Sequence, residues 1–147
     1  MKVLIAEDDV MQADCLAEAL TEDGHVLCGI ASTVADGVAL AREHRPDAAI
    51  IDMQLSSVDL GSQIAEQLSE SGDLGYTGIL YVTGGAFRTD QEVRVGHAYL
   101  NKPYSFATLS ASLVIVGEIA RDGCTSRKLP RGLHLLRPAR FGALAEV

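Results

Sequence analysis

The strongest constraint on the fold is a series of five short, continuous apolar runs. None is longer than six residues, and they are rich in Val, Ile, Leu and Ala. Such runs are typical of strands that are buried on both faces of a sheet. Strands with one solvent-exposed face instead alternate apolar and polar residues. The runs lie at 3–6, 26–31, 48–51, 78–82 and 98–100. We therefore predict five strands that are covered on both faces.

The segments between these runs carry apolar residues at helical spacing. The spacing i, i+3, i+4, i+7 places such residues on one side of a helix. Three segments show it: Ala13, Leu16, Ala17 and Leu20; Val34, Gly37, Val38 and Ala41; and Gly61, Ile64, Ala65 and Leu68. A last helix is predicted from Ser105 to about Gly123. A fourth helix is expected within 86–96, where the alternation of Val93 and Val95 suits a strand equally well.

The regular alternation of strands and helices predicts the α/β class. Five βα units form a parallel sheet that is doubly wound, with right-handed crossovers and helices on both faces. In such folds ligands bind at the carboxyl ends of the strands, where the strand order reverses. Asp52, in the stretch "AIIDMQL", comes directly after the third predicted strand. This placement makes Asp52 a candidate functional residue.

Three other predicted strands also end in polar groups. Glu7, Asp8 and Asp9 follow the first strand, Thr83 follows the fourth, and Lys102 follows the fifth. Crowded carboxylates raise each other's pKa values unless a cation neutralises them, and a site rich in oxygen ligands favours Mg²⁺. A lysine and a hydroxyl can hold the oxygens of a transferred phosphoryl group. Asp52 is then a candidate nucleophile.

Four stretches in this chain resemble those of a known family. They are "VLIAEDD", "AAIIDMQL", "ILYVTGG" and "YLNKPYS", and they follow one another in this order. The chain therefore resembles the response regulator receiver domain of two-component signalling, over residues 1 to about 121. The resemblance implies the flavodoxin-like form of the five-stranded parallel sheet.

The resemblance also implies a role for each polar group at the strand ends. Asp52 would be the phosphoacceptor, and Glu7 and Asp8 would hold Mg²⁺ together with Asp52. The hydroxyl of Thr83 would move toward the phosphoryl group, and Lys102 would form an ion pair with the phosphoryl group.

Further positions carry roles that the resemblance implies. Gln54 would offer its backbone carbonyl to the metal, and its side chain would face the attacking water. Tyr99 matches an aromatic switch position, with ordinary strand packing as an equal alternative. Asp9 and Gly84 would line the site without binding the metal, and Asp9 is also expected to cap the first helix.

Two segments depart from the family pattern. In "LSSVDLG", Ser56 stands where the family usually has proline and Leu60 where it usually has glycine. The segment from Thr83 to Lys102 is shorter than usual, and this shortening affects the expected fourth helix.

These residues predict a phosphorylation-dependent signalling switch rather than a turnover enzyme. The chain would accept a phosphoryl group on Asp52 from a histidine kinase or a phosphotransfer protein, and would signal by binding a downstream protein. It would catalyse only its own phosphorylation and dephosphorylation. Two alternatives remain open: a binding module with a vestigial acidic site, and a Mg²⁺-dependent hydrolase that passes through an aspartyl phosphate. The second would need a general acid where Gln54 stands.

Charge divides the chain into an acidic body and a basic tail. Residues 1–121 contain 7 Lys and Arg against 18 Asp and Glu, and residues 122–147 contain 5 against 2. An acidic body disfavours direct DNA binding. The tail is expected to be flexible or to dock on a partner, including a second copy of the chain, and to form no separate effector domain. Because no apolar run resembles a leader or a membrane span, we expect no membrane interaction and a cytoplasmic location.

Overall fold

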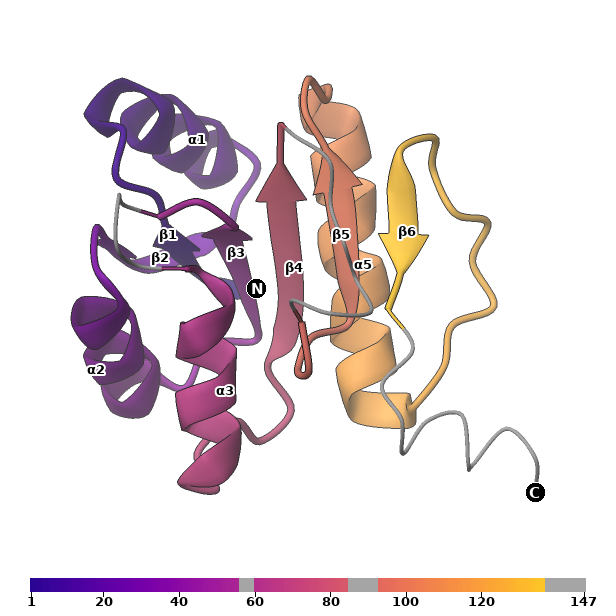
Figure 1. Ribbon diagram of the computed structural model, residues 1–147. Helices are drawn as coiled ribbons and strands as arrows, with labels where there is room; N and C mark the ends of the chain where they lie inside the picture. The colour runs from indigo at the N-terminus through magenta and orange to yellow at the C-terminus, as the bar shows by residue number, and fades with distance from the viewer. Residues whose placement is uncertain (56–59, 85–92, 137–147) are drawn as a thin grey trace.

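The computed structural model describes residues 1–55, 60–84 and 93–136. Within them the chain forms one six-stranded sheet with strand order β2-β1-β3-β4-β5-β6 (Figure 1). Strands β1 to β5 are parallel, and β6 pairs antiparallel with β5. The strands are β1 Lys2–Ala6, β2 Val26–Ala31, β3 Ala48–Asp52, β4 Gly78–Thr83, β5 Ala98–Asn101 and β6 Leu133–Leu135. The parallel α/β fold predicted from the sequence is confirmed.

Helices cover both faces of the sheet. They are α1 Val10–Glu22, α2 Val34–His44, α3 Ser62–Glu70 and α5 Phe106–Asp122. Helices α2 and α3 pack on one face, against buried residues that include Leu4, Ile51 and Tyr81. Helices α1 and α5 pack on the other face, against residues that include Ile5 and Leu80. The alternation of side chains along each strand divides the core into these two layers.

The helix boundaries follow local capping signals. Thr33 accepts a hydrogen bond from the backbone of the first turn of α2, and Ser105 does the same for α5. Helix α5 ends at Gly123, whose φ of 82° lies in the left-handed region that favours glycine. Both predicted ends of this helix are confirmed.

The five predicted strands are present, but the structure differs from the prediction in two respects. First, β2 lies at an edge of the sheet, so Val26 is 61% exposed and Ile30 is 39% exposed. Second, the sheet has a sixth strand, β6, formed by the basic tail. It pairs with β5, which would otherwise present an unpaired edge. The tail is therefore part of the sheet as far as Leu136, and residues 137–147 lie outside the described residues.

The helix expected within 86–96 falls mostly on residues 85–92, which lie outside the described residues. The described part, 93–96, is not helical. Val93 and Val95 pack against the α2 and α3 side of the core. Among the described residues, none of the helices is long and apolar enough to cross a membrane.

Candidate functional site

Asp52 is the last residue of β3, in the middle of the sheet. The next residue, Met53, donates a backbone hydrogen bond to Val82 of the neighbouring β4. The Asp52 side chain is 12% exposed, and its Oδ1 accepts a hydrogen bond of 2.9 Å from the backbone N–H of Gln54. Asp52 is therefore held at the carboxyl end of the sheet with its carboxylate at the surface of the core.

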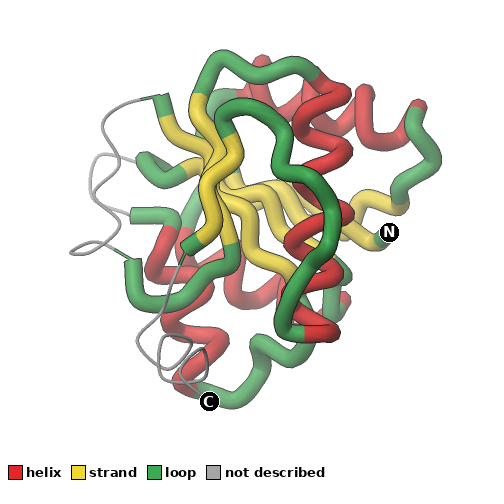
Figure 2. Tube along the Cα trace, turned by 90° about the vertical axis from the view of Figure 1, so that its right-hand side faces the viewer, coloured by secondary structure: helices red, strands yellow, loops and turns green. Residues whose placement is uncertain are grey.

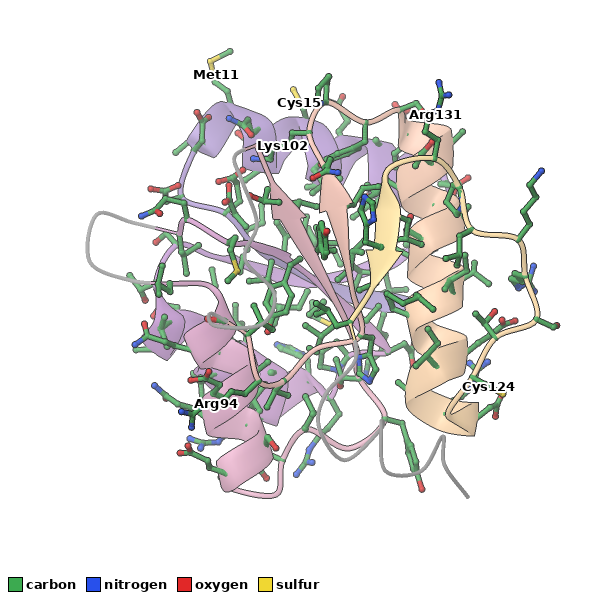
Figure 3. All side chains as sticks on the ribbon, turned by 45° about the vertical axis from the view of Figure 1, so that its right-hand side comes forward. Met11, Cys15, Arg94, Lys102, Cys124 and Arg131 are labelled. Atoms are coloured by element: carbon green, nitrogen blue, oxygen red, sulfur yellow. The ribbon has the colours of Figure 1, made fainter. Side chains whose placement is uncertain are left out.

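Lys102 directly follows β5 and reaches back over the sheet to Asp52. Its Nζ lies 3.0 Å from Asp52 Oδ2 and 3.7 Å from Glu7 Oε1. Its backbone N–H donates to the carbonyl of Thr83, which fixes the turn after β5 to the end of β4. Figure 3 shows Lys102 at the end of the sheet that faces α1. Burial alone would lower the pKa of Lys102, but the hydrogen bond and the charge of Asp52 raise it above its usual value, with help from Glu7.

Glu7 follows β1 and is nearly buried. Its side chain is 8% exposed, and its Oε2 accepts a hydrogen bond from the backbone N–H of Asp9. Burial raises the pKa of Glu7 to about 7, and the hydrogen bond and negative charge of Asp52 add to the effect. Near neutral pH, Glu7 therefore keeps part of a proton that an exposed glutamate would have lost.

The acidic residues after Glu7 have different positions. Asp8 is exposed. In the part of the chain that the structure describes, no three acidic, histidine or cysteine side chains converge as metal ligands. Asp9 caps α1, since its Oδ1 accepts from the backbone N–H of Gln12. The structure thus brings Glu7, Asp52 and Lys102 together, whereas the Asp8 side chain is exposed beside them. It also confirms that Asp9 caps α1.

The remaining predicted residues surround this group. Thr83 is half-buried at the end of β4, where it pairs in register with Asn101 of β5. Gly84 is exposed, and its Cα faces the side chain of Lys102. Gln54 is exposed beside Asp52. Tyr99 is half-buried within β5, and its ring stacks on His134 of β6.

Two residues of the site were not found from the sequence. Gln12 extends from α1 so that its Oε1 accepts a hydrogen bond from Lys102 Nζ at 3.3 Å. Gly61 packs so closely on the carbonyl of Asp52 that a Cβ atom would collide with it. The sequence carries no signal for either contact, because both depend on how a helix docks on the strand ends.

The donor set fits a divalent cation. Glu7 and Asp52 are carboxylates that crowd each other in a nearly buried place, and a cation would relieve their repulsion. Asp8 is adjacent to Glu7 in the chain, and Gln54 lies beside Asp52, whose Oδ1 accepts its backbone N–H. These oxygen donors are the kind that Mg²⁺ prefers.

A comparison with known proteins identifies the family to which this chain belongs. The model of the response regulator receiver domain family matches residues 3–114. The chain belongs to this family. It is a receiver domain of two-component signalling, which confirms the resemblance found in the sequence.

Relatives of this receiver domain include a curated response regulator. The chain is 30% identical over 106 residues to the polar-differentiation response regulator DivK of Brucella anthropi, covering 70% of this chain and 85% of DivK. DivK of Brucella ovis matches to the same extent.

Solved structures share the receiver fold. A receiver domain of a modulated diguanylate cyclase from Desulfovibrio desulfuricans matches with a TM-score of 0.68 and 27% identity, over 82% of this chain and 95% of that one. The receiver domain of sensor histidine kinase PA1611 from Pseudomonas aeruginosa matches with a TM-score of 0.67 and 23% identity, over 76% and 93% of the chains. That structure has a magnesium ion coordinated in its active site cleft. At this identity the likeness shows the fold alone.

Proposed function

We propose that this receiver domain is a phosphorylation-dependent switch with Asp52 as the phosphoacceptor. The observation that carries the proposal is the 3.0 Å contact between Lys102 Nζ and Asp52 Oδ2, beside a nearly buried Glu7. A carboxylate held by a fixed ammonium at the surface of the core is both accessible and positioned for attack.

The transfer requires little covalent chemistry from the protein. An Asp52 oxygen forms a bond to phosphorus while the bond from phosphorus to the donor's histidine nitrogen breaks, and the freed imidazole takes up a proton. Lys102 then offers its ammonium to the phosphoryl oxygens, and the Thr83 hydroxyl donates to another of them. Glu7, Asp8, Asp52 and the carbonyl of Gln54 would hold Mg²⁺, which supplies charge neutralisation when bound.

A switch fits the site better than the two alternatives do. Gln54 carries an amide, which cannot act as a general acid at neutral pH, so the aspartyl phosphate persists rather than turning over quickly. A vestigial site would not need to hold Lys102 between two carboxylates. The solved receiver domain of PA1611, which is described with magnesium in its active site cleft, supports Mg²⁺ as the cofactor.

The partners follow from the chemistry. A histidine kinase or a histidine phosphotransfer protein would donate the phosphoryl group, and a downstream protein would bind the phosphorylated form. The chain would act in the cytoplasm, would not bind DNA directly, and would signal through residues near Thr83 and Tyr99. The match to the response regulator DivK supports this assignment of class.

Mass spectrometry after treatment with acetyl phosphate and Mg²⁺ tests the proposal. One phosphoryl group should be added, and it should be lost in Asp52→Asn and in EDTA. Asp14→Asn, an exposed aspartate on α1, is the matched control and should keep full labelling. Label that persists in Asp52→Asn would refute the phosphoacceptor.

A further inference from the structure

The outer edge of β5 is covered by the chain's own C-terminal segment. The strap, defined as residues 124–136, leaves α5, runs along the outside of the molecule and returns as β6 (Figures 1 and 2). Leu133, His134 and Leu135 pair in register with Leu100, Tyr99 and Ala98. Backbone hydrogen bonds extend the pairing at both ends, from Asn101 to Gly132 and from Leu136 to His97. The strap therefore adds a full strand ladder to β5.

The start of β6 lies at the same end of the sheet as the candidate phosphorylation site. In Figure 3, Arg131 and Lys102 lie at the same end of the sheet. The amide nitrogen of Asn101 lies 3.2 Å from His134 Nε2, and Asn101 directly precedes Lys102. The ring of Tyr99 stacks on His134 with 4.7 Å between centroids and 18° between planes. One residue of the strap thus contacts two residues of β5, and one of these is bonded to Lys102.

The contacts of β6 are few and mostly exposed. Leu133 is 5% exposed and packs on the α5 side of the core, and Leu136, just after β6, is half-buried against the α2 and α3 side, whereas His134 and Leu135 are exposed. A three-residue strand with one buried side chain contributes a net stability of a few kcal/mol at most. An equilibrium of this size can be shifted by a modest change at a neighbouring group.

A separate anchor holds the start of the strap. Arg127 Nε lies 2.7 Å from Glu118 Oε2 of α5, and the Thr125 hydroxyl donates to Glu118 Oε1 at 2.7 Å. Because this anchor lies away from β5, β6 can leave the sheet while the strap stays tethered to α5. The edge of β5 would then be free for another strand.

We propose that the outer edge of β5 is a docking surface for an extended segment of a partner protein, and that β6 occupies it until Asp52 is phosphorylated. The partner segment pairs antiparallel with residues 98–100 and places a leucine-like side chain where Leu133 lies, in the manner of strand addition to a sheet edge. The chain's own strap shows that this edge accepts such a segment. The inference rests on the proposed function of Asp52 and adds the surface through which the switch is read.

The direction of the change follows from charge. A phosphoryl group adds close to two negative charges beside Lys102, so the ammonium moves toward the phosphoryl oxygens and draws the turn after β5 with it. Asn101, bonded to Lys102, then loses its exposed contact with His134. An inward rotation of Tyr99 toward Thr83 would remove the stacked ring as well. Both losses weaken β6, and neither weakens the rest of the sheet.

Hydrogen exchange of the full chain with and without beryllofluoride and Mg²⁺ tests the coupling. Within 133–136, the amides of His134 and Leu136 point toward β5 and its preceding residues, so their exchange should rise about tenfold or more with beryllofluoride, while amides of β1 and β3 stay protected. Unchanged protection of 133–136, with amides around 52–54 shifted by bound beryllofluoride, would overturn this inference and leave the proposed function intact. Failure of beryllofluoride to bind at Asp52 would overturn both.

Two variants separate coupling from simple loosening. His134→Ala removes the ring and the Asn101 contact but keeps the strand, so exchange of 133–136 should respond to beryllofluoride less than in the parent chain. Leu135→Ala is the matched control, because Leu135 is exposed and pairs in register with Ala98, whereas His134 pairs with Tyr99. Equal responses in the two variants would overturn the route through His134.

A synthetic peptide tests the docking surface itself. The labelled peptide PRGLHLL, which repeats residues 130–136, should bind the parent chain at least tenfold more tightly with beryllofluoride than without it. Leu133→Asp, which removes the native side chain from the edge, should bind the peptide without beryllofluoride. No binding to either protein would overturn the docking surface. A dimer formed with beryllofluoride while 133–136 stay protected would show strap exchange between two copies and would overturn a partner segment as the occupant.

Discussion

The site at the carboxyl ends of β1, β3 and β5 and the strap along β5 are neighbours held by different forces. At the site, two nearly buried carboxylates share one lysine, and Glu7 has a raised pKa. Along the strap, strand pairing, one buried leucine and a stacked ring hold β6 to the edge. Charge crowding makes the site respond strongly to any added charge. The strap is held by weak neutral contacts, so it can respond at small energetic cost.

Removing the lysine should give the largest effect. Lys102→Ala takes away the cation that contacts Asp52 and Glu7, so phosphorylation of Asp52 should slow by about 100-fold or more. The rate of labelling by acetyl phosphate measures it. Lys128→Ala, an exposed lysine of the strap, is the control and should label at the parent rate. Equal rates in the two variants would show that the site does not depend on its ammonium.

The crowded carboxylates should make stability depend on pH. The pKa of Glu7 is about 7 in the folded protein, above its ordinary value of 4.5. Between these pH values the folded protein keeps a proton that the unfolded chain has lost, so the free energy of unfolding falls as pH rises. Without metal, we expect a loss on the order of 2–3 kcal/mol from Glu7 between pH 5 and pH 8.

Urea unfolding in EDTA across this pH range checks the effect. Glu7→Gln imitates the protonated side chain, so its stability should fall less steeply with pH than that of the parent. Glu18→Gln, an exposed glutamate on α1, should follow the parent. If the free energy of unfolding depended on pH in the same way in the parent and in Glu7→Gln, crowding of Glu7 and Asp52 would not raise the pKa of Glu7.

A core substitution in the strap should affect stability without affecting chemistry. Leu133→Ala removes a side chain that is 5% exposed, so the free energy of unfolding should fall by about 2 kcal/mol. Asp52 should still be phosphorylated at the parent rate. Leu135→Ala, which is 39% exposed, should cost less than half as much. A parallel loss of phosphorylation would show that the two regions are one unit.

The surface anchor of the strap should contribute least. Arg127→Ala breaks a 2.7 Å contact with Glu118, but the arginine side chain is 56% exposed, so we expect a loss below about 1 kcal/mol. Thermal unfolding at low and high salt measures it, and the difference from the parent should shrink in high salt. A larger loss than that of Leu133→Ala would mean that the anchor, rather than β6, holds the strap.

The residues of the site were predictable because each one ends an element that carries its own local signal. Asp52 and Lys102 follow apolar runs, and parallel strands bring their carboxyl ends to one edge. Their 3.0 Å contact was therefore expected. The separation of Glu7 from Asp8 was not, because which of two adjacent acids turns inward depends on how the chain leaves β1 for the cap at Asp9. Gln12 and Gly61 were missed for the same kind of reason.

By itself, the sequence determined the α/β class, the bounds of α5 and the residue types at the strand ends, since periodicity, caps and turns act between residues close in the chain. Only the tertiary structure decided the order of the strands, and with it the exposure of β2 and the pairing of β6 with β5. The segment "LHL" is too short and too polar to predict a strand alone. It becomes one because β5, more than thirty residues earlier in the chain, offers an unpaired row of backbone donors and acceptors and a place for Leu133 against α5.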